Sequence, residues 1–373
     1  MKHILWLCSW YPNEVDKFRG DFVQRQAIAT SQYCKIDVVH VLFCDVEKTT
    51  VAKVNENLTE HIFYVKKKNR LVDFLYYYFI HQIIRRQLKN KIDLVHVQVA
   101  MNAGIVAFIW KKIYNLPYVV TEHYGIYNDT IDDSFSKRSY VYQLACKQVF
   151  KCATLLISVS KFIAEGIKKE VCDVKVEVAN NVVNTNLFYH QAEKDNSIFQ
   201  FVHISNLSSN KNVIGILQAF EKILKLHNNI ELIIVGGEQT YIDSLILDFI
   251  NSKHKIKFTG EVEYTQVASF IQKGDCTIIN SKIENSPCVI IESLCCGVPV
   301  IATNVGGIPE LISKENGILV ESNNLHQLAD AMNELIENKS NYNAIEISKK
   351  AIQKYSYESV GKKINEIYNA LIH

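Results

Sequence analysis

Short, almost wholly apolar runs alternate with longer helical patterns along the entire chain. In the first half these runs occupy residues 3–9, 37–44, 94–99, 118–122, 153–159 and 175–179, and in the second half residues 200–205, 231–235, 255–259, 276–280, 298–303 and 317–320. Such runs are typical of parallel strands that are buried on both faces. The alternation therefore predicts the α/β class, with two doubly wound domains.

The length of 373 residues fits two such domains. We expect a first Rossmann-like domain over residues 1–188 and a second over residues 198–356, with the polar segment 189–197 as the linker. A helical pattern ends the sequence, and we expect residues 357–373 to pack back toward the first domain. Ligands of doubly wound folds bind beyond the carboxyl ends of the strands, so two facing domains would form a site in the cleft between them.

Charge and cysteine content exclude several classes of protein. The 41 basic and 39 acidic side chains give a formal net charge of +2, whereas dedicated nucleic-acid binders carry a larger basic excess. The ten cysteines form no CxxC or CxxH spacing and lie inside apolar runs, which favours buried thiols in a reducing compartment over zinc or disulfides. The apolar run at residues 4–8 is too short for a signal peptide, and residues 71–84 are too few to span a bilayer. We expect a cytoplasmic protein, either free or peripheral at the inner face of the cell membrane.

The most informative segment runs from Glu284 to Thr303. Glu284 follows an expected strand, Pro287 suits the first turn of a helix, and Gly297 suits the end of that helix. The first amides of this helix, near Cys288 and Val289, would bind an anion. Glu292 lies just over one turn inside the helix. Carboxylates on either side of an anion site are poor phosphate ligands but good acceptors for the hydroxyl groups of a sugar or a ribose.

Other loops converge on the same edge of the expected sheet. Gly236 and Gly237 follow the run at 231–235, and small residues there allow a ligand to approach the backbone closely. Lys211 follows the run at 200–205 and could supply positive charge for a phosphate.

These motifs, in this order and spacing, resemble the nucleotide-sugar-binding domain of retaining glycosyltransferases of family 4, which have the GT-B fold. The segments that carry the resemblance are Lys211, Gly236–Gly237, Thr259–Gly260, the Glu284-x7-Glu292 motif with its Cys-Gly-Val-Pro-Val tail, and residues 303–310. The resemblance implies a retaining hexosyltransferase that moves a sugar from a UDP- or GDP-linked donor to a hydroxyl of a glycan or lipid-linked acceptor. It also implies a role in cell-surface polysaccharide biosynthesis, an acceptor-binding first domain and a donor-binding second domain.

By the same resemblance, two residues are catalytic: Glu284, which would hold the transferred sugar, and His123, which would lie near the sugar and the acceptor. Substrate-binding roles fall on Lys211 for the diphosphate, Glu292 for the ribose, and Gly20, Asn206, Gly236, Gly237, Asn285, Ser286, Pro287, Cys288 and Val289. Asn206 stands where the family usually has an arginine, and an amide does not replace a guanidinium charge. Arg19, Arg25 or Lys282 could supply the second cation.

No acidic cluster typical of a metal site occurs in the sequence, so we expect neither a required divalent ion nor a cofactor. Retention could proceed through a carboxylate nucleophile or through front-face attack, and the sequence leaves both open. Two alternatives to a transferase are a catalytically weak nucleotide-sugar-binding partner, suggested by Asn206, and a nucleotide-sugar epimerase of the same architecture. The Glu284-x7-Glu292 motif disfavours the epimerase.

The segment from Lys66 to Lys91 is strongly basic and contains a run of aromatic residues. Its charged residues are Lys66, Lys67, Lys68, Arg70, Arg85, Arg86, Lys89 and Lys91 against Asp73 alone. A basic, aromatic face of this kind could dock on an anionic membrane. The alternative is an ordinary core helix with solvated charges at its ends.

Overall fold

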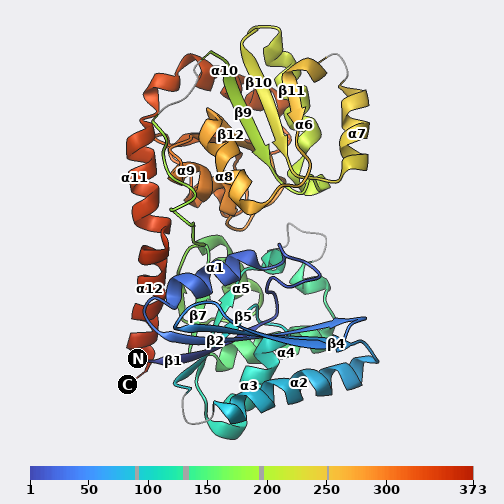
Figure 1. Ribbon diagram of the computed structural model, residues 1–373, viewed down its shortest axis with the longest axis vertical. Helices are drawn as coiled ribbons and strands as arrows, with labels where there is room; N and C mark the ends of the chain where they lie inside the picture. The colour runs from blue at the N-terminus through green and yellow to red at the C-terminus, as the bar shows by residue number, and fades with distance from the viewer. Residues whose placement is uncertain (89–91, 129–133, 193–196, 250–251, 373) are drawn as a thin grey trace. The chain divides into compact units, whose positions relative to one another are not determined.

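The computed structural model describes residues 1–88, 92–128, 134–192, 197–249 and 252–372. The chain divides into two compact units (Figure 1). The N-terminal unit comprises Met1–Val182 together with Tyr357–His373, and the C-terminal unit comprises Val183–Ser356. The acidic residues of the expected linker, Glu193 and Asp195, and its Lys194 lie outside the described residues.

The N-terminal unit is built on an eight-stranded sheet with the order β3-β4-β2-β1-β5-β6-β7-β8. Its strands are β1 (His3–Cys8), β2 (Lys35–Cys44), β3 (Lys48–Lys53), β4 (Leu58–Lys66), β5 (Leu94–Gln98), β6 (Tyr118–Glu122), β7 (Leu155–Ser158) and β8 (Val176–Val178). Neighbouring strands pair in parallel throughout the described sheet except for β3, which is antiparallel to β4.

Helices cover both faces of this sheet. They are α1 (Asp21–Thr30), α2 (Arg70–Gln87), α3 (Ala103–Tyr114), α4 (Tyr140–Cys152), α5 (Lys161–Glu170) and α12 (Tyr357–Leu371). The first hydrophobic core joins one face of the sheet to α2, α3, α4 and α5, and another joins the opposite face to α1 and α12. In the second of these cores, Tyr368 of α12 is fully buried and its hydroxyl lies 2.5 Å from Nδ1 of His96 on β5.

The C-terminal unit is built on a six-stranded sheet with the order β11-β10-β9-β12-β13-β14. Its strands are β9 (Phe199–Ile204), β10 (Ile230–Val235), β11 (Ile256–Phe258), β12 (Cys276–Ile279), β13 (Val300–Thr303) and β14 (Gly317–Val320), and all the pairs described are parallel. The strand order reverses between β9 and β12, which makes this edge the topological switch point where doubly wound folds bind ligands.

Six α-helices in the described part of this unit pack on its sheet: α6 (Val213–Leu224), α7 (Gln239–Asp248), α8 (Tyr264–Lys273), α9 (Cys288–Cys295), α10 (Leu325–Glu337) and α11 (Ala344–Tyr355). One core combines the sheet with α6, α7 and α10, and another combines it with α8, α9 and α11. The predicted α/β class with two doubly wound, mostly parallel sheets is confirmed.

Two details differ from the expectation. The sequence did not indicate β3 and β4, because β3 is polar and lies at the edge of its sheet, and β4 carries Thr59, Glu60 and His61 among its apolar residues. The helix expected from Pro287 begins one residue later, at Cys288, and Pro287 is its N-cap with extended backbone angles. Among the described residues, no helix combines the length and the apolarity needed to cross a membrane.

Candidate functional site

Most of the candidate residues of the C-terminal unit lie on loops at the carboxyl ends of its strands. Lys211 follows β9, Gly236 and Gly237 follow β10, and Glu284 follows β12. The loop after β13 carries Gly306 and Gly307. Since β9 and β12 flank the switch point, their loops meet where a ligand of such a fold binds.

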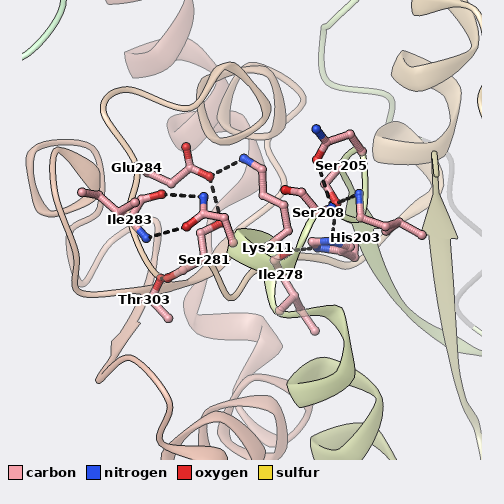
Figure 2. Close-up of polar contacts among 12 residues, drawn as sticks. His203, Ser205, Ser208, Lys211, Ile278, Ser281, Ile283, Glu284 and Thr303 are labelled. Atoms are coloured by element: carbon pink, nitrogen blue, oxygen red, sulfur yellow. Dashed lines mark hydrogen bonds and ion pairs between the residues drawn. The ribbon is translucent and has the colours of Figure 1, made fainter. Parts of the chain in front are cut away.

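Lys211 and Glu284 form an ion pair at this place (Figure 2). Nζ of Lys211 donates to Oε1 of Glu284 at 2.5 Å, and the Ser281 hydroxyl donates to the same oxygen at 2.8 Å. The Lys211 side chain is 26% exposed and that of Glu284 is 12% exposed, so both groups are accessible yet held. A cation beside a partly buried carboxylate can bind a phosphate and a hydroxyl group side by side.

The loop that carries Glu284 is clamped from two sides. Asn210 donates through Nδ2 to the carbonyl of Ile283 at 3.0 Å and accepts from the Ile283 amide through Oδ1 at 3.2 Å. On the other side, the Thr303 hydroxyl donates to the carbonyl of Ser281 at 2.6 Å (Figure 2). These contacts connect the loops after β9 and β12 with each other and with the last residue of β13, so the loop that carries Glu284 is fixed to the sheet.

Gly306 holds Glu284 from a third direction. Its φ of +57° is in the left-handed region, and a Cβ atom there would lie 1.8 Å from the Glu284 carbonyl oxygen. The amide of Gly307 donates to that same carbonyl at 2.9 Å. A side chain at position 306 would therefore push the Glu284 backbone away.

Gly236 and Gly237 pack against the loop after β9. Both have positive φ, and their Cβ atoms would lie 2.1 Å from the Ser205 carbonyl oxygen and 2.3 Å from the Leu207 side chain. These two glycines therefore allow a close approach between backbone segments. Their predicted contact with a ligand stays a prediction.

Asn206 lies on that same loop and is exposed. Its Oδ1 accepts from the Ser208 amide at 3.2 Å, so the side chain stabilises the turn. Lys282, one of the three proposed substitutes for the family arginine, lies on the Glu284 loop with an exposed side chain, and its amide donates to the carbonyl of Asn210 at 2.8 Å. Of the three candidates, Lys282 belongs to the C-terminal unit, whereas Arg19 and Arg25 belong to the N-terminal unit, and which of them supplies a second cation stays a prediction.

The start of α9 is the second part of the candidate site. Asn285, Ser286 and Pro287 lead into the first turn, which contains Cys288 and Val289. Glu292 is buried one turn later, and its Oε1 accepts from the Tyr264 hydroxyl at 2.8 Å. Tyr264 is a positioning residue that the sequence did not indicate.

In the N-terminal unit, the structure brings Gly20 and His123 to neighbouring places. Gly20 is the N-cap of α1 with φ +75°, and a Cβ atom there would lie 2.8 Å from the backbone of Trp10 and Tyr11. Two residues further on, the ring of Phe22 lies 4.7 Å from the ring of His123. The predicted loop after the first strand and the histidine after β6 therefore belong to one cluster.

His123 is buried and neutral. Burial lowers the pKa of its imidazole to about 3. Nε2 lies 3.0 Å from Oε1 of Gln98, and because that oxygen is an acceptor, Nε2 carries the proton. The imidazole can therefore take part in hydrogen bonds but supplies no positive charge near neutral pH.

Glu122, just before His123, organises this loop. Its carboxylate accepts from the amides of Ala100, His123 and Tyr124 and from the Tyr127 hydroxyl, at 2.8 to 3.1 Å. Complete burial raises the pKa of this carboxyl, and the hydrogen bonds act in the opposite direction. Glu122 is thus a second positioning residue to which the sequence assigned no role.

Within the described ranges, no group of three or more His, Cys, Asp or Glu side chains is arranged to hold a metal ion.

Comparison with known proteins gives two consecutive family matches. Residues 37–187 match the model described as Glycosyltransferase Family 4, and residues 187–356 match the model described as Glycosyl transferases group 1. An uncharacterized glycosyltransferase of Methanocaldococcus jannaschii is 27% identical over 282 residues, which cover 75% of this chain and 76% of that protein.

Solved structures show the same fold over the whole length. Sucrose-phosphate synthase of Thermosynechococcus elongatus has a TM-score of 0.82 at 16% identity, covering 100% of this chain and 99% of its own. Anabaena HepE in complex with UDP has a TM-score of 0.75 at 20% identity, covering 99% of this chain and 100% of its own. The two family matches and the shared two-sheet fold show that this chain is a GT-B glycosyltransferase similar to family 4.

Proposed function

We propose that the protein is a retaining hexosyltransferase that moves a sugar from a nucleoside-diphosphate sugar to a hydroxyl group of a glycan or lipid-linked acceptor. The observation that carries this proposal is the Lys211–Glu284 pair, clamped by three loops at the switch point of the C-terminal sheet. HepE, with the same fold, has been solved with UDP and with UDP-glucose, which favours a uridine donor over a guanosine donor.

We assign donor binding to the C-terminal unit and acceptor binding to the N-terminal unit. In this proposal Glu292, held by Tyr264, accepts hydrogen bonds from the ribose, and Lys211 turns toward the diphosphate. Glu284 then accepts from hydroxyl groups of the sugar. The first amides of α9, at Cys288 and Val289, bind the sugar or the distal phosphate, as helix N-termini do. The loop residues Asn285 and Ser286 complete the same wall.

In the proposed reaction, the bond between the anomeric carbon and the diphosphate oxygen breaks, and a bond from that carbon to the acceptor oxygen forms. The electron pair of the broken bond leaves with the diphosphate, and the proton of the acceptor hydroxyl passes to the departing diphosphate oxygen or to solvent. Lys211 and the α9 amides stabilise this developing charge, which is the usual dominant form of catalysis. Neutral His123 and the Gly20 loop would orient the sugar and acceptor. Retention through a carboxylate nucleophile and retention through front-face attack both agree with this set of residues.

We also propose that the reaction takes place in the cytoplasm and contributes to cell-surface polysaccharide. Each of the ten cysteines is a thiol, as expected for a reducing compartment.

The test is transfer from UDP-sugars by Lys211→Ala and Glu284→Ala variants. Each should lose at least about tenfold in kcat/KM, since each removes a charged contact to the donor. Lys257→Ala is the matched control, because it breaks another Lys–Glu pair of the same unit, with Nζ 2.8 Å from Oε2 of Glu231. Full activity in both site variants would overturn the assignment of the site.

Asn206 favours one alternative, a nucleotide-sugar-binding protein with weak catalysis. Its side chain is neutral and engaged in a turn, so the site has one cation fewer than the family pattern. Such a protein would bind UDP-sugar in calorimetry but would neither transfer nor hydrolyse it.

A further inference from the structure

The outward side of α2 is apolar. Leu71, Leu75, Phe79 and Ile83 follow one another at a spacing of four residues, which aligns them along one side of a helix. All four are exposed, with Leu71 at 71% and Phe79 at 59%. We call these four residues the α2 ridge. Helices of water-soluble folds normally direct such a row into the core, so a ridge on the outside indicates something that covers it.

The same helix does have a core-facing side. Tyr77 and Ile84 are buried and belong to the core that α2 shares with α3 and α4, on the same face of the sheet (Figure 1). The α2 ridge is therefore additional to the contacts that hold the helix on its unit.

Positive charge lies at both ends of the ridge. Lys66 at the end of β4, Lys67 and Lys68 in the following loop and Arg70 at the start of α2 are exposed, and so is Arg86 near the end of α2. In the described part of this segment the only carboxylate is Asp73. Because the whole chain carries a net charge of only +2, this is a local concentration of charge.

The structure changes one detail of the predicted basic segment and does not describe two of its lysines. Arg85 is buried, with its guanidinium 3.7 Å from the Tyr114 ring, so it takes no part in an exposed basic face. Lys89 and Lys91 lie outside the described residues.

A cavity of about 870 Å³ lies next to the ridge. It is lined by Arg70 and Phe74 of α2, by Val141 of α4, and by Met101 from the loop after β5. Tyr140 and Val141, at the start of α4, are strongly exposed and extend the apolar surface beyond α2.

We propose that α2 docks this unit on an anionic lipid bilayer, with the α2 ridge among the acyl chains and the lysines and arginines at its two ends at the headgroups. An apolar side bordered by cations is the pattern of a helix that lies in a membrane interface. A second copy of the chain is a poorer occupant, because it would bring like charges together. The proposal rests on the transferase function in one respect: docking would bring the neighbouring cavity to the surface where a lipid-linked acceptor lies.

The test is sedimentation of the full chain with phosphatidylcholine vesicles that contain or lack phosphatidylglycerol. We expect at least about tenfold stronger partitioning to the anionic vesicles, and a loss of that preference at high salt. The Leu71→Ser/Phe79→Ser variant should bind at least about tenfold more weakly. Its matched control is Leu247→Ser/Ile345→Ser, which removes side chains of similar exposure, 70% and 64%, from the C-terminal unit.

The charge is tested separately with Lys67→Glu, which should weaken binding several-fold, against Lys349→Glu, which should not. The proposal fails if anionic vesicles bind no better than neutral ones, or if the ridge variant binds like the control. It also fails if the ridge variant abolishes a concentration-dependent self-association in light scattering, which would make the ridge an interface between copies. UDP affinity measured without vesicles reports on the donor site alone, so it separates a failure of docking from a failure of the proposed reaction.

Discussion

At the residue scale, burial determines which form of His123 is present. With its pKa lowered to about 3, the imidazole stays neutral at every pH at which such an enzyme is assayed. Its proton sits on the nitrogen that faces Gln98, so the side chain is oriented by its surroundings. This makes His123 a hydrogen-bonding group in the proposed reaction and not a cation.

We therefore predict that His123→Ala lowers sugar transfer at least about tenfold while UDP binding in calorimetry stays unchanged. The pH profile of wild-type kcat/KM should show no step from this histidine between pH 5 and 8. His254→Ala, at an exposed position, is the control and should change neither sugar transfer nor UDP binding. Full transfer activity in the His123 variant would remove this residue from the site.

The sequence could point to Lys211 and Glu284 one at a time, because each follows an apolar run and belongs to a known motif. It could not show that they pair, since they are 73 residues apart. The same holds for Tyr264 and Glu292, which are 28 residues apart on different helices. Contacts of this kind depend on how strands are ordered in a sheet, and residue spacing carries no information about that order.

At the element scale, the loop after β13 can be tested by comparing two glycines. Gly306 and Gly260 both have positive φ, but a Cβ atom at 306 meets the Glu284 backbone, whereas one at 260 meets nothing within 4 Å. Gly260→Ala should therefore cost only about 1–2 kcal/mol of stability and should leave the backbone of Glu284 in place.

Gly306→Ala should in addition displace Glu284 and lower kcat/KM at least about tenfold. Denaturant titration measures the loss of stability of both variants. A transfer assay measures the loss of activity expected from the displacement of Glu284. Equal activity in the two variants would mean that the loop does not position Glu284.

Strands were predictable where their residues are almost all apolar and not where polar residues interrupt the run, as in β3 and β4. The central strands β1 and β10 are buried along their whole length, so they occur in the sequence as apolar runs. β3 has the sequence Lys-Thr-Thr-Val-Ala-Lys and is mostly exposed, so it lacks that pattern. Edge strands are commonly charged, which prevents pairing with other chains.

At the scale of the whole molecule, neutral buried histidines occur in both units and make stability depend on pH. Burial lowers the pKa of His96 to about 3 and that of His203 to about 4, whereas histidine in an unfolded chain titrates near 6.5. Below about pH 6.5 the unfolded chain binds protons that the folded chain does not, so stability falls as the pH falls. At pH 5 the loss is about 2 kcal/mol for each such histidine.

Urea unfolding at pH 7.5, 6 and 5 should therefore show a falling midpoint. The urea midpoint of the C-terminal unit can be recognised because bound UDP should raise it. His203→Gln should reduce the pH-dependent decrease of that midpoint. A midpoint that is constant or rises toward pH 5 would contradict the neutral state of these histidines.

The chain leaves the N-terminal unit after Val182 and returns to it only at Tyr357, and this order has a consequence for biosynthesis. The N-terminal unit needs α12, whose Tyr368 fills its core, yet the 174 residues of Val183–Ser356 are translated before that helix. At roughly 5–20 residues per second, the ribosome needs roughly 10 to 35 s for that stretch. During this interval the nascent N-terminal unit lacks the helix that completes its core, whereas the C-terminal unit has all of its own residues before α12 is translated.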